Sequence, residues 1–221
     1  MRIRDIKREA RASLKSRWGF AILLSIISFG VYTIIPLIIE ILFSGNLSTW
    51  YNQEGAPANA QFISWLFTIA LYPIMYGFNI TFLEIIRKEP VKFKNVFQGF
   101  DATKYFKILG AFILTSVYTF LWFLLFMIPA IIKSISYSQV YFVLKDNPDL
   151  SPRAAITKSR QLMKGNKWKY FLLTLSFIGW TFLSILTVFI GFIWLVPYMT
   201  ASLAAFYDSL EKSNEVKESL E

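Results

Sequence analysis

Six long apolar runs alternate with shorter basic or polar segments along this 221-residue chain. A run of about 20 apolar residues crosses the ~30 Å hydrocarbon core of a bilayer as an α-helix, since a helix satisfies its own backbone polar groups. The pattern predicts an all-α fold: a polytopic transmembrane helical bundle of three helical hairpins, forming one integral membrane domain. The predicted spans cover residues 18–43, 62–86, 105–127, 129–145, 168–190 and 192–210.

The composition supports this class and excludes several kinds of chemistry. Hydrophobic residues make up 55% of the chain and charged residues 17%, against about 25% charged residues in an average soluble domain. A soluble protein of this size would expose apolar patches far larger than is usual. The chain has no Cys and no His, which excludes disulfides, thiolate chemistry and histidine-based catalysis or metal binding. We therefore expect a protein that is not an enzyme and that holds no metal or cofactor.

Positively charged residues gather in four segments between and beside the predicted spans. Residues 1–17 hold seven, 87–107 six, 145–169 seven and 211–221 two of the 23 Lys and Arg residues, and the one that remains, Lys133, lies inside a span. Cationic loops resist translocation and mark the cytoplasmic side. We therefore expect a multi-pass protein of the cell membrane with both termini in the cytoplasm. If 129–145 did not cross, the basic segment 145–169 would be external, which the same rule disfavours.

The basic segments also predict contacts with lipid headgroups. Ile3, Ile6, Ala10 and Leu14 recur at helical spacing, so residues 1–17 are predicted to form an amphipathic helix on the headgroups. A solvated basic tail is the alternative. The cations of 145–169 are expected to attract anionic lipids, and no nucleic-acid partner is expected because these charges flank membrane spans.

Capping residues indicate two helix boundaries. In the segment 145–169, Ser151 and Pro152 are suited to the cap and the first position of a helix. Pro129 suits the first position of the fourth span. The polar tail 211–221 is expected to be frayed.

A threefold repeat is visible beneath the span pattern. Each hairpin begins with basic and aromatic residues, and each returning helix contains a proline: Pro73, Pro129 or Pro197. A constant offset of 124 relates Leu71, Pro73, Met75, Phe82, Glu84 and Lys88 to Leu195, Pro197, Met199, Phe206, Asp208 and Lys212. The alternative is convergence, because basic-aromatic flanks and prolines are common in membrane helices.

Few ionisable residues lie within the spans, and such residues are costly in lipid. Lys133 lies near the proposed outer turn of the second hairpin, and Glu40 ends the first span on the same side. We hypothesise that an ion pair between them ties the first two hairpins together, although two separate interfacial residues would also explain the pattern.

Other polar residues suggest packing or a lining surface. Tyr137 and Gln139 lie in a polar stretch of the fourth span with Ser134, Ser136 and Ser138, which favours close helix packing over a substrate-lining face. Pro197 and Tyr198 interrupt the sixth span, either as a simple kink or as a broken helix of the kind that builds transporter sites.

Acidic residues lie near the cytoplasmic ends of two spans. Glu84 and Asp208 are followed closely by Arg87 and Lys212. Local ion pairs at the helix ends are favoured over a proton relay, because too few carboxylates lie within the spans for ion coupling.

One long segment, 127–180, has the sequence MIPAIIKSISYSQVYFVLKDNPDLSPRAAITKSRQLMKGNKWKYFLLTLSFIGW. Together with the start IRDIKREARASLKSRWG and Pro197-Tyr198, it resembles the bacterial, mainly Gram-positive, integral membrane family catalogued as domain of unknown function 975. The resemblance covers most of the chain apart from 44–61 and the tail. Ala130 departs from the family pattern, which usually has Gly there. The resemblance implies a membrane fold and no reaction.

Two functions remain open at this point. The first is a non-catalytic scaffold, accessory or immunity-type factor that acts through contacts with the lipid bilayer, including anionic headgroups, and with other membrane proteins. The second is a small transporter or lipid-handling protein with a cavity between hairpins. A cavity lined by Tyr137, Gln139, Lys133 or Tyr198 would favour the second.

Overall fold

The computed structural model describes residues 2–52 and 56–219, which form helices, turns and loops without a β-strand. Five helical segments in this part of the chain are long and apolar enough to cross a membrane: Trp18–Phe43, Ala58–Ile86, Ala102–Leu125, Met127–Asp146 and Lys167–Leu186. The all-helical class is confirmed. The predicted sixth span at 192–210 is not among the five, so the number of spans stays a prediction.

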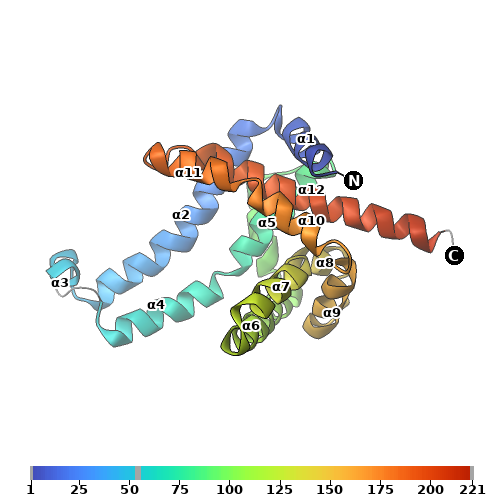
Figure 1. Ribbon diagram of the computed structural model, residues 1–221. Helices are drawn as coiled ribbons and strands as arrows, with labels where there is room; N and C mark the ends of the chain where they lie inside the picture. The colour runs from blue at the N-terminus through green and yellow to red at the C-terminus, as the bar shows by residue number, and fades with distance from the viewer. Residues whose placement is uncertain (1, 53–55, 220–221) are drawn as a thin grey trace.

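The first hairpin follows the predicted boundaries on its outgoing side. Helix α2 covers Trp18–Phe43, as predicted, and α3 (Leu47–Asn52) lies at its tip (Figure 1). The returning span is divided into α4 (Ala58–Ala70) and α5 (Pro73–Ile86). Pro73 occupies the start of α5 because its missing N–H needs no partner in the first turn of a helix.

A short 3-10 helix, η1 (Phe93–Phe100), closes the first hairpin against α5. A β-carbon on Gly77 would lie 1.9 Å from the carbonyl oxygen of Val96, and one on Gly99 would lie 2.7 Å from that of Pro73. Only glycine permits this backbone approach. Val96 is buried, whereas Phe93, Phe97 and Phe100 are exposed.

The second hairpin consists of α6 (Ala102–Leu125), α7 (Met127–Tyr137) and α8 (Val140–Asp146), followed by α9 (Pro152–Leu162). Ser151 caps α9 by accepting a hydrogen bond from the Ala154 N–H, with Pro152 at the first position, which confirms that prediction. Pro129 is the third residue of α7. The prediction that Pro129 takes the first position of this helix is therefore wrong by two residues. The helix begins earlier because the extended residue that separates α6 from α7 is Phe126.

The third hairpin consists of α10 (Lys167–Leu175), α11 (Ile178–Leu186) and the long α12 (Phe192–Glu218). Its tip is tight: Val188 and Phe189 have positive φ, and a β-carbon on Gly191 would meet Ser184. The frayed tail predicted from 211 is wrong up to Glu218, because α12 continues to that residue. Residues 220 and 221 of the predicted tail lie outside the described part.

Helix α1 (Ile3–Leu14) confirms the predicted helix but not its predicted environment. Ile6, Ala10 and Leu14 are buried, and α1 contacts α12, α5 and α10. The apolar face of α1 is therefore covered by protein and not by lipid, because α12 offers a complementary apolar surface. The predicted place of this helix at the headgroups stays a prediction.

The three hairpins diverge from a common centre formed by α1, α5, α8 and α12 (Figure 1). The core residues include Phe82, Phe206 and Tyr207, all with an exposed fraction of 1% or less. In contrast, only 11% of the residues in the most apolar stretch of α6 are buried, and only 22% of those in the most apolar stretch of α2. The apolar helices thus cover one another only in part, and they expose large side chains such as Phe123 and Leu124.

Candidate functional site

A partly buried ionic junction joins all three hairpins at this centre. Arg87 directly follows α5, Asp146 ends α8, and Asp208 lies on α12. The Nη1 and Nη2 atoms of Arg87 donate to the two carboxylate oxygens of Asp146 at 2.6 and 2.7 Å. Its Nε donates to Asp208 Oδ1 at 2.9 Å. One guanidinium at the end of the first hairpin therefore binds the returning helices of the other two hairpins.

The charges of this junction compensate one another. The side chain of Asp208 is only 4% exposed, and an unpaired carboxylate at that depth would be strongly unfavourable. Hydrogen bonds from Arg87 to Asp146 and Asp208 raise the pKa of Arg87 further above its usual range. Lys212 also pairs with Asp208, and Tyr207 donates to Asp146 Oδ2 at 2.8 Å. Asp208 with Lys212 is the local helix-end pair that the sequence predicts.

In a second ion pair beside the junction, the second hairpin supplies the cation and the first hairpin the carboxylate. Lys145 Nζ on α8 donates to Glu84 Oε1 on α5 at 2.7 Å, and Asn95 donates to Glu84 Oε2 at the same distance. The predicted local pairing of Glu84 with Arg87 is wrong, since each residue instead binds a group from the second hairpin. Within the described residues, no group of three or more acidic side chains is placed to hold a metal ion.

Sequence reasoning missed Asp146 and Lys145 as junction residues. A signal for them exists at a second offset: Ile86-Arg87-Lys88-Glu89-Pro90 corresponds to Leu144-Lys145-Asp146-Asn147-Pro148 fifty-eight residues later. Arg87 and Lys145 occupy equivalent places in these segments, and each binds a carboxylate of the other hairpin. An internal alignment at this offset would have drawn attention to both residues.

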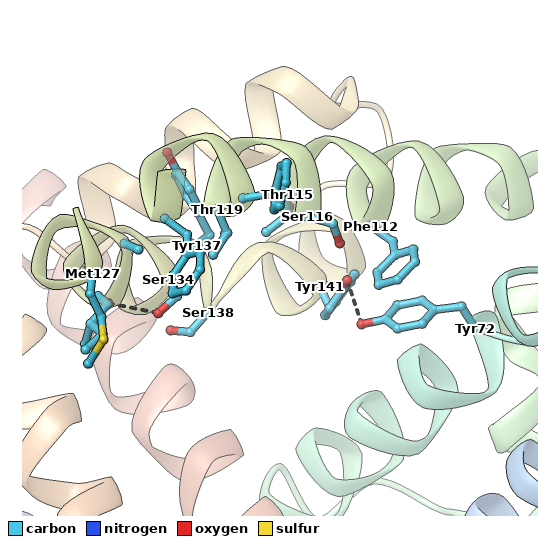
Figure 2. Close-up of a pocket in the computed structure, with 14 residues that line it drawn as sticks. Tyr72, Phe112, Thr115, Ser116, Thr119, Met127, Ser134, Tyr137, Ser138 and Tyr141 are labelled. Carbon is cyan, nitrogen blue, oxygen red and sulfur yellow. Dashed lines mark hydrogen bonds between the residues drawn. The ribbon is translucent and has the colours of Figure 1, made fainter. Parts of the chain in front are cut away.

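An open groove runs along α6 and α7, with a volume of about 710 Å³ (Figure 2). Tyr137 and Ser138 line it opposite Thr115 and Phe112, and Tyr141 donates to the Tyr72 hydroxyl at 2.9 Å at one end. The predicted polar stretch of the fourth span therefore contributes to a lining surface. Gln139 is buried beside it and donates to Ser138 Oγ at 2.7 Å.

Several hydroxyl groups of this groove already donate to their own helices. Thr115 donates to the Ala111 carbonyl, Ser134 to Ile131 and Ser138 to Ile135, at 2.6 to 2.9 Å. Such bonds to the preceding turn reduce the cost of placing a hydroxyl in an apolar medium. The groove therefore suits an apolar chain or a helix better than a strongly polar solute.

The hypothesis of a Glu40–Lys133 ion pair is wrong. Within the described residues these side chains form no pair, and Lys133 Nζ instead lies 4.5 Å from the centroid of the Trp122 ring. The two helices that carry Glu40 and Lys133 diverge, so the residues cannot meet (Figure 1). The tryptophan face instead attracts the ammonium through its ring quadrupole.

Pro197 and Tyr198 lie near the start of α12, away from the groove of Figure 2. Pro197 is buried inside the helix. The Tyr198 hydroxyl accepts a hydrogen bond from Arg11 Nη2 at 3.4 Å. This pair of residues therefore contacts α1, and the structure does not bring it together with Tyr137, Gln139 or Lys133.

These features define an all-helical protein with five helices able to cross a membrane and an ionic junction that joins its hairpins. The chain belongs to the family described as "Protein of unknown function (DUF975)", whose profile matches residues 1–136 and 123–214. The overlapping matches leave only 215–221 outside, and they confirm the resemblance noted in the sequence. No curated protein and no solved structure matches the chain.

Proposed function

We propose that this protein is a non-catalytic scaffold of the cell membrane. In this proposal, the ionic junction is a rigid cytoplasmic centre that holds apolar hairpins apart in the bilayer. Their exposed sides bind lipids and the helices of other membrane proteins. The N- and C-termini both lie in the cytoplasm, with the basic segments beside the anionic headgroups.

The observation that carries this proposal is the contrast between the centre and the hairpins. Arg87 is bonded to Asp146 and Asp208 from two other hairpins, whereas Phe120, Phe123 and Leu124 of α6 are each at least 59% exposed. Lipid alone can cover such a surface, but diverging hairpins also offer separate helix faces to partner proteins. A passage through the membrane would instead need spans that surround it.

Site-specific photo-crosslinking in native membranes tests the scaffold. A photoreactive residue at exposed Phe123 is expected to give discrete adducts with partner polypeptides. The same residue at Phe82, which is fully buried, serves as the matched control and is expected to give none. If Phe123 and equally exposed positions on α2 and α11 give lipid adducts only, the scaffold proposal fails.

A specific observation favours the alternative, a lipid-handling protein or small transporter. The groove of Figure 2 is apolar, open and carries a row of hydroxyls between the second and first hairpins. A lipid chain would lie along it beside Tyr137 and Tyr141. Replacing Ser134 by Leu would fill the groove, so a lipid-handling function predicts loss of function in S134L with unchanged crosslinks at Phe123.

A further inference from the structure

Two cavities outside the groove of Figure 2 meet at helix α1. The first, which we term the basic groove, has a volume of about 780 Å³ and is lined by Ile3, Arg4, Lys7, Arg8, Arg11 and Tyr198. The second, which we term the tryptophan pocket, has a volume of about 490 Å³. Its lining includes Trp18, Trp180 and Trp194, and it shares Arg11 and Tyr198 with the basic groove. A strongly cationic cavity thus continues directly into an apolar one.

Three of the four cations of the basic groove have no carboxylate partner within the part of the chain that the structure describes. Lys7 Nζ donates to the Ser176 carbonyl at 3.3 Å and lies 4.1 Å from the centroid of the Phe177 ring. Among the described residues, Arg4, Lys7 and Arg11 form no ion pair, and Arg8 reaches Asp5 only at 3.9 Å. Partial burial and the neighbouring Arg11 lower the pKa of Lys7. A bound anion would relieve this repulsion.

The tryptophan pocket also determines at which depth in the membrane the third hairpin lies. Trp18 at the start of α2 lines the same pocket as Thr187 and Gly191 at the hairpin tip. The six-span prediction places these residues on opposite faces of a hydrocarbon core ~30 Å thick. They cannot line one pocket and also lie that far apart, so the third hairpin lies beside the start of α2.

The contacts of α1 place the third hairpin at the same depth in the membrane. Lys7 and Arg11 contact Ser176 and Tyr198, which lie inside the predicted fifth and sixth spans. Cationic side chains are very costly at the bilayer centre, so these contacts belong in the headgroup layer. Three tryptophans then share one level, as they do in the aromatic belts of membrane interfaces.

We infer that the basic groove and the tryptophan pocket together bind one anionic phospholipid. Its phosphate lies among Lys7, Arg8 and Arg11, and one acyl chain enters the pocket between Trp180 and Trp194. Guanidinium groups suit phosphate because their planar donors can bind two oxygens at once. The inference rests on the proposed membrane location, since the cavities must face the headgroup layer. The lipid fastens α1 and the third hairpin to the cytoplasmic surface.

Lipid titration of the full chain in neutral detergent tests this site. The probes are phosphatidylglycerol and phosphatidylcholine with identical acyl chains, and inorganic phosphate, with binding measured by native mass spectrometry. We expect phosphatidylglycerol to bind about tenfold more tightly than phosphatidylcholine. The double variant K7Q/R11Q is expected to lose this tenfold preference for phosphatidylglycerol. R11K is expected to retain most of it, because the positive charge is kept. K15Q removes an exposed α1 cation outside both cavities, and it is the matched control.

The apolar half of the site has its own readout. W180A is expected to weaken the binding of both phospholipids. Inorganic phosphate is expected to compete poorly with them, because it leaves the tryptophan pocket empty. Equal binding of the two lipids, or an equal loss in K15Q, would show only diffuse charge attraction and overturn the inference. Competition by inorganic phosphate as strong as that by phosphatidylglycerol would overturn it too. Circular dichroism checks that each variant keeps its helices.

Failure here is distinguishable from failure of the proposed function. Extraction of membranes at alkaline pH releases proteins that do not span the bilayer. If the chain is released, the membrane proposal itself fails. If the chain is retained while K7Q/R11Q binds phosphatidylglycerol as tightly as the unmodified chain does, only the lipid site fails.

Discussion

The ammonium of Lys145 binds the carboxylate of Glu84 at 2.7 Å, from the second hairpin back to the first. Arg87 binds Asp146 from the first hairpin to the second. The pair of hairpins is thus joined by two ion pairs of opposite direction. Removing any one of these four charges therefore leaves a charged partner on the other hairpin without its ion pair.

Removal of the Arg87 charge is expected to destabilise the protein strongly. R87M leaves Asp146 and Asp208 without their shared donor. Because Arg87 and Asp146 are only partly buried and Asp208 keeps Lys212, we expect a cost somewhat below the ~3–5 kcal/mol of breaking a fully buried pair. The midpoint of thermal unfolding in detergent should fall markedly. K94M, which removes an exposed cation of η1, is the control and should leave the midpoint unchanged. An R87M midpoint equal to that of K94M would show that the junction carries no stability.

The close contact of α5 with η1 predicts a large difference between two glycine substitutions. G77A would place a methyl group 1.9 Å from the Val96 carbonyl oxygen, so η1 must move away. Overpacking of this kind typically costs about 1–3 kcal/mol. G19A on α2 meets no atom within 4 Å and should be neutral or slightly stabilising. Equal unfolding midpoints for the two variants would contradict the observed packing.

Replacement of Glu211 by Gln is expected to stabilise the protein in a way that depends on pH. Burial raises the pKa of this carboxyl above its usual value, and its Oε2 is buried without a hydrogen-bond partner among the described residues. A raised folded-state pKa means that ionisation destabilises the fold at pH values above it. E211Q should therefore raise the unfolding midpoint at pH 8. At pH 3, where the carboxyl is protonated in both states, the gain should disappear, and a gain that persists at pH 3 would exclude this cause.

The absence of cysteine makes topology directly measurable with single-cysteine variants. Y51C, on the tip helix α3, should react with a membrane-impermeant maleimide added to intact cells. K94C should react only after the cells are opened, because the basic segments are expected to be cytoplasmic. External labelling of K94C would overturn the proposed orientation.

Position 186 distinguishes the two arrangements of the third hairpin. Leu186 is 79% exposed at the hairpin tip. Six spans predict that L186C reacts from outside, whereas a hairpin at the cytoplasmic interface predicts protection in intact cells. Labelling of L186C from outside at the rate of Y51C would therefore contradict the interfacial hairpin.

Sequence reasoning located most helices because their causes are local. The first span matched α2 residue for residue, and Ser151-Pro152 marked the start of α9 through its own capping chemistry. The junction was only half visible. Glu84 and Asp208 attracted attention as acidic residues near span ends, and the local pair of Asp208 with Lys212 was predicted, but their partners from other hairpins lie 61 and 121 residues away. Charge type alone does not reveal a partner at such a distance.

The sequence by itself determined the helical class, the apolar segments and the grouping of cations, because hydropathy and backbone hydrogen bonding act over a few turns. Tertiary structure decided which surfaces are covered. It buried the apolar face of α1 against α12, kept Glu40 from Lys133, and brought Trp18 to the tip of the third hairpin. The physical reason is that burial and ion pairing depend on where helices cross, and the crossing follows from complementary surfaces of segments far apart in the chain.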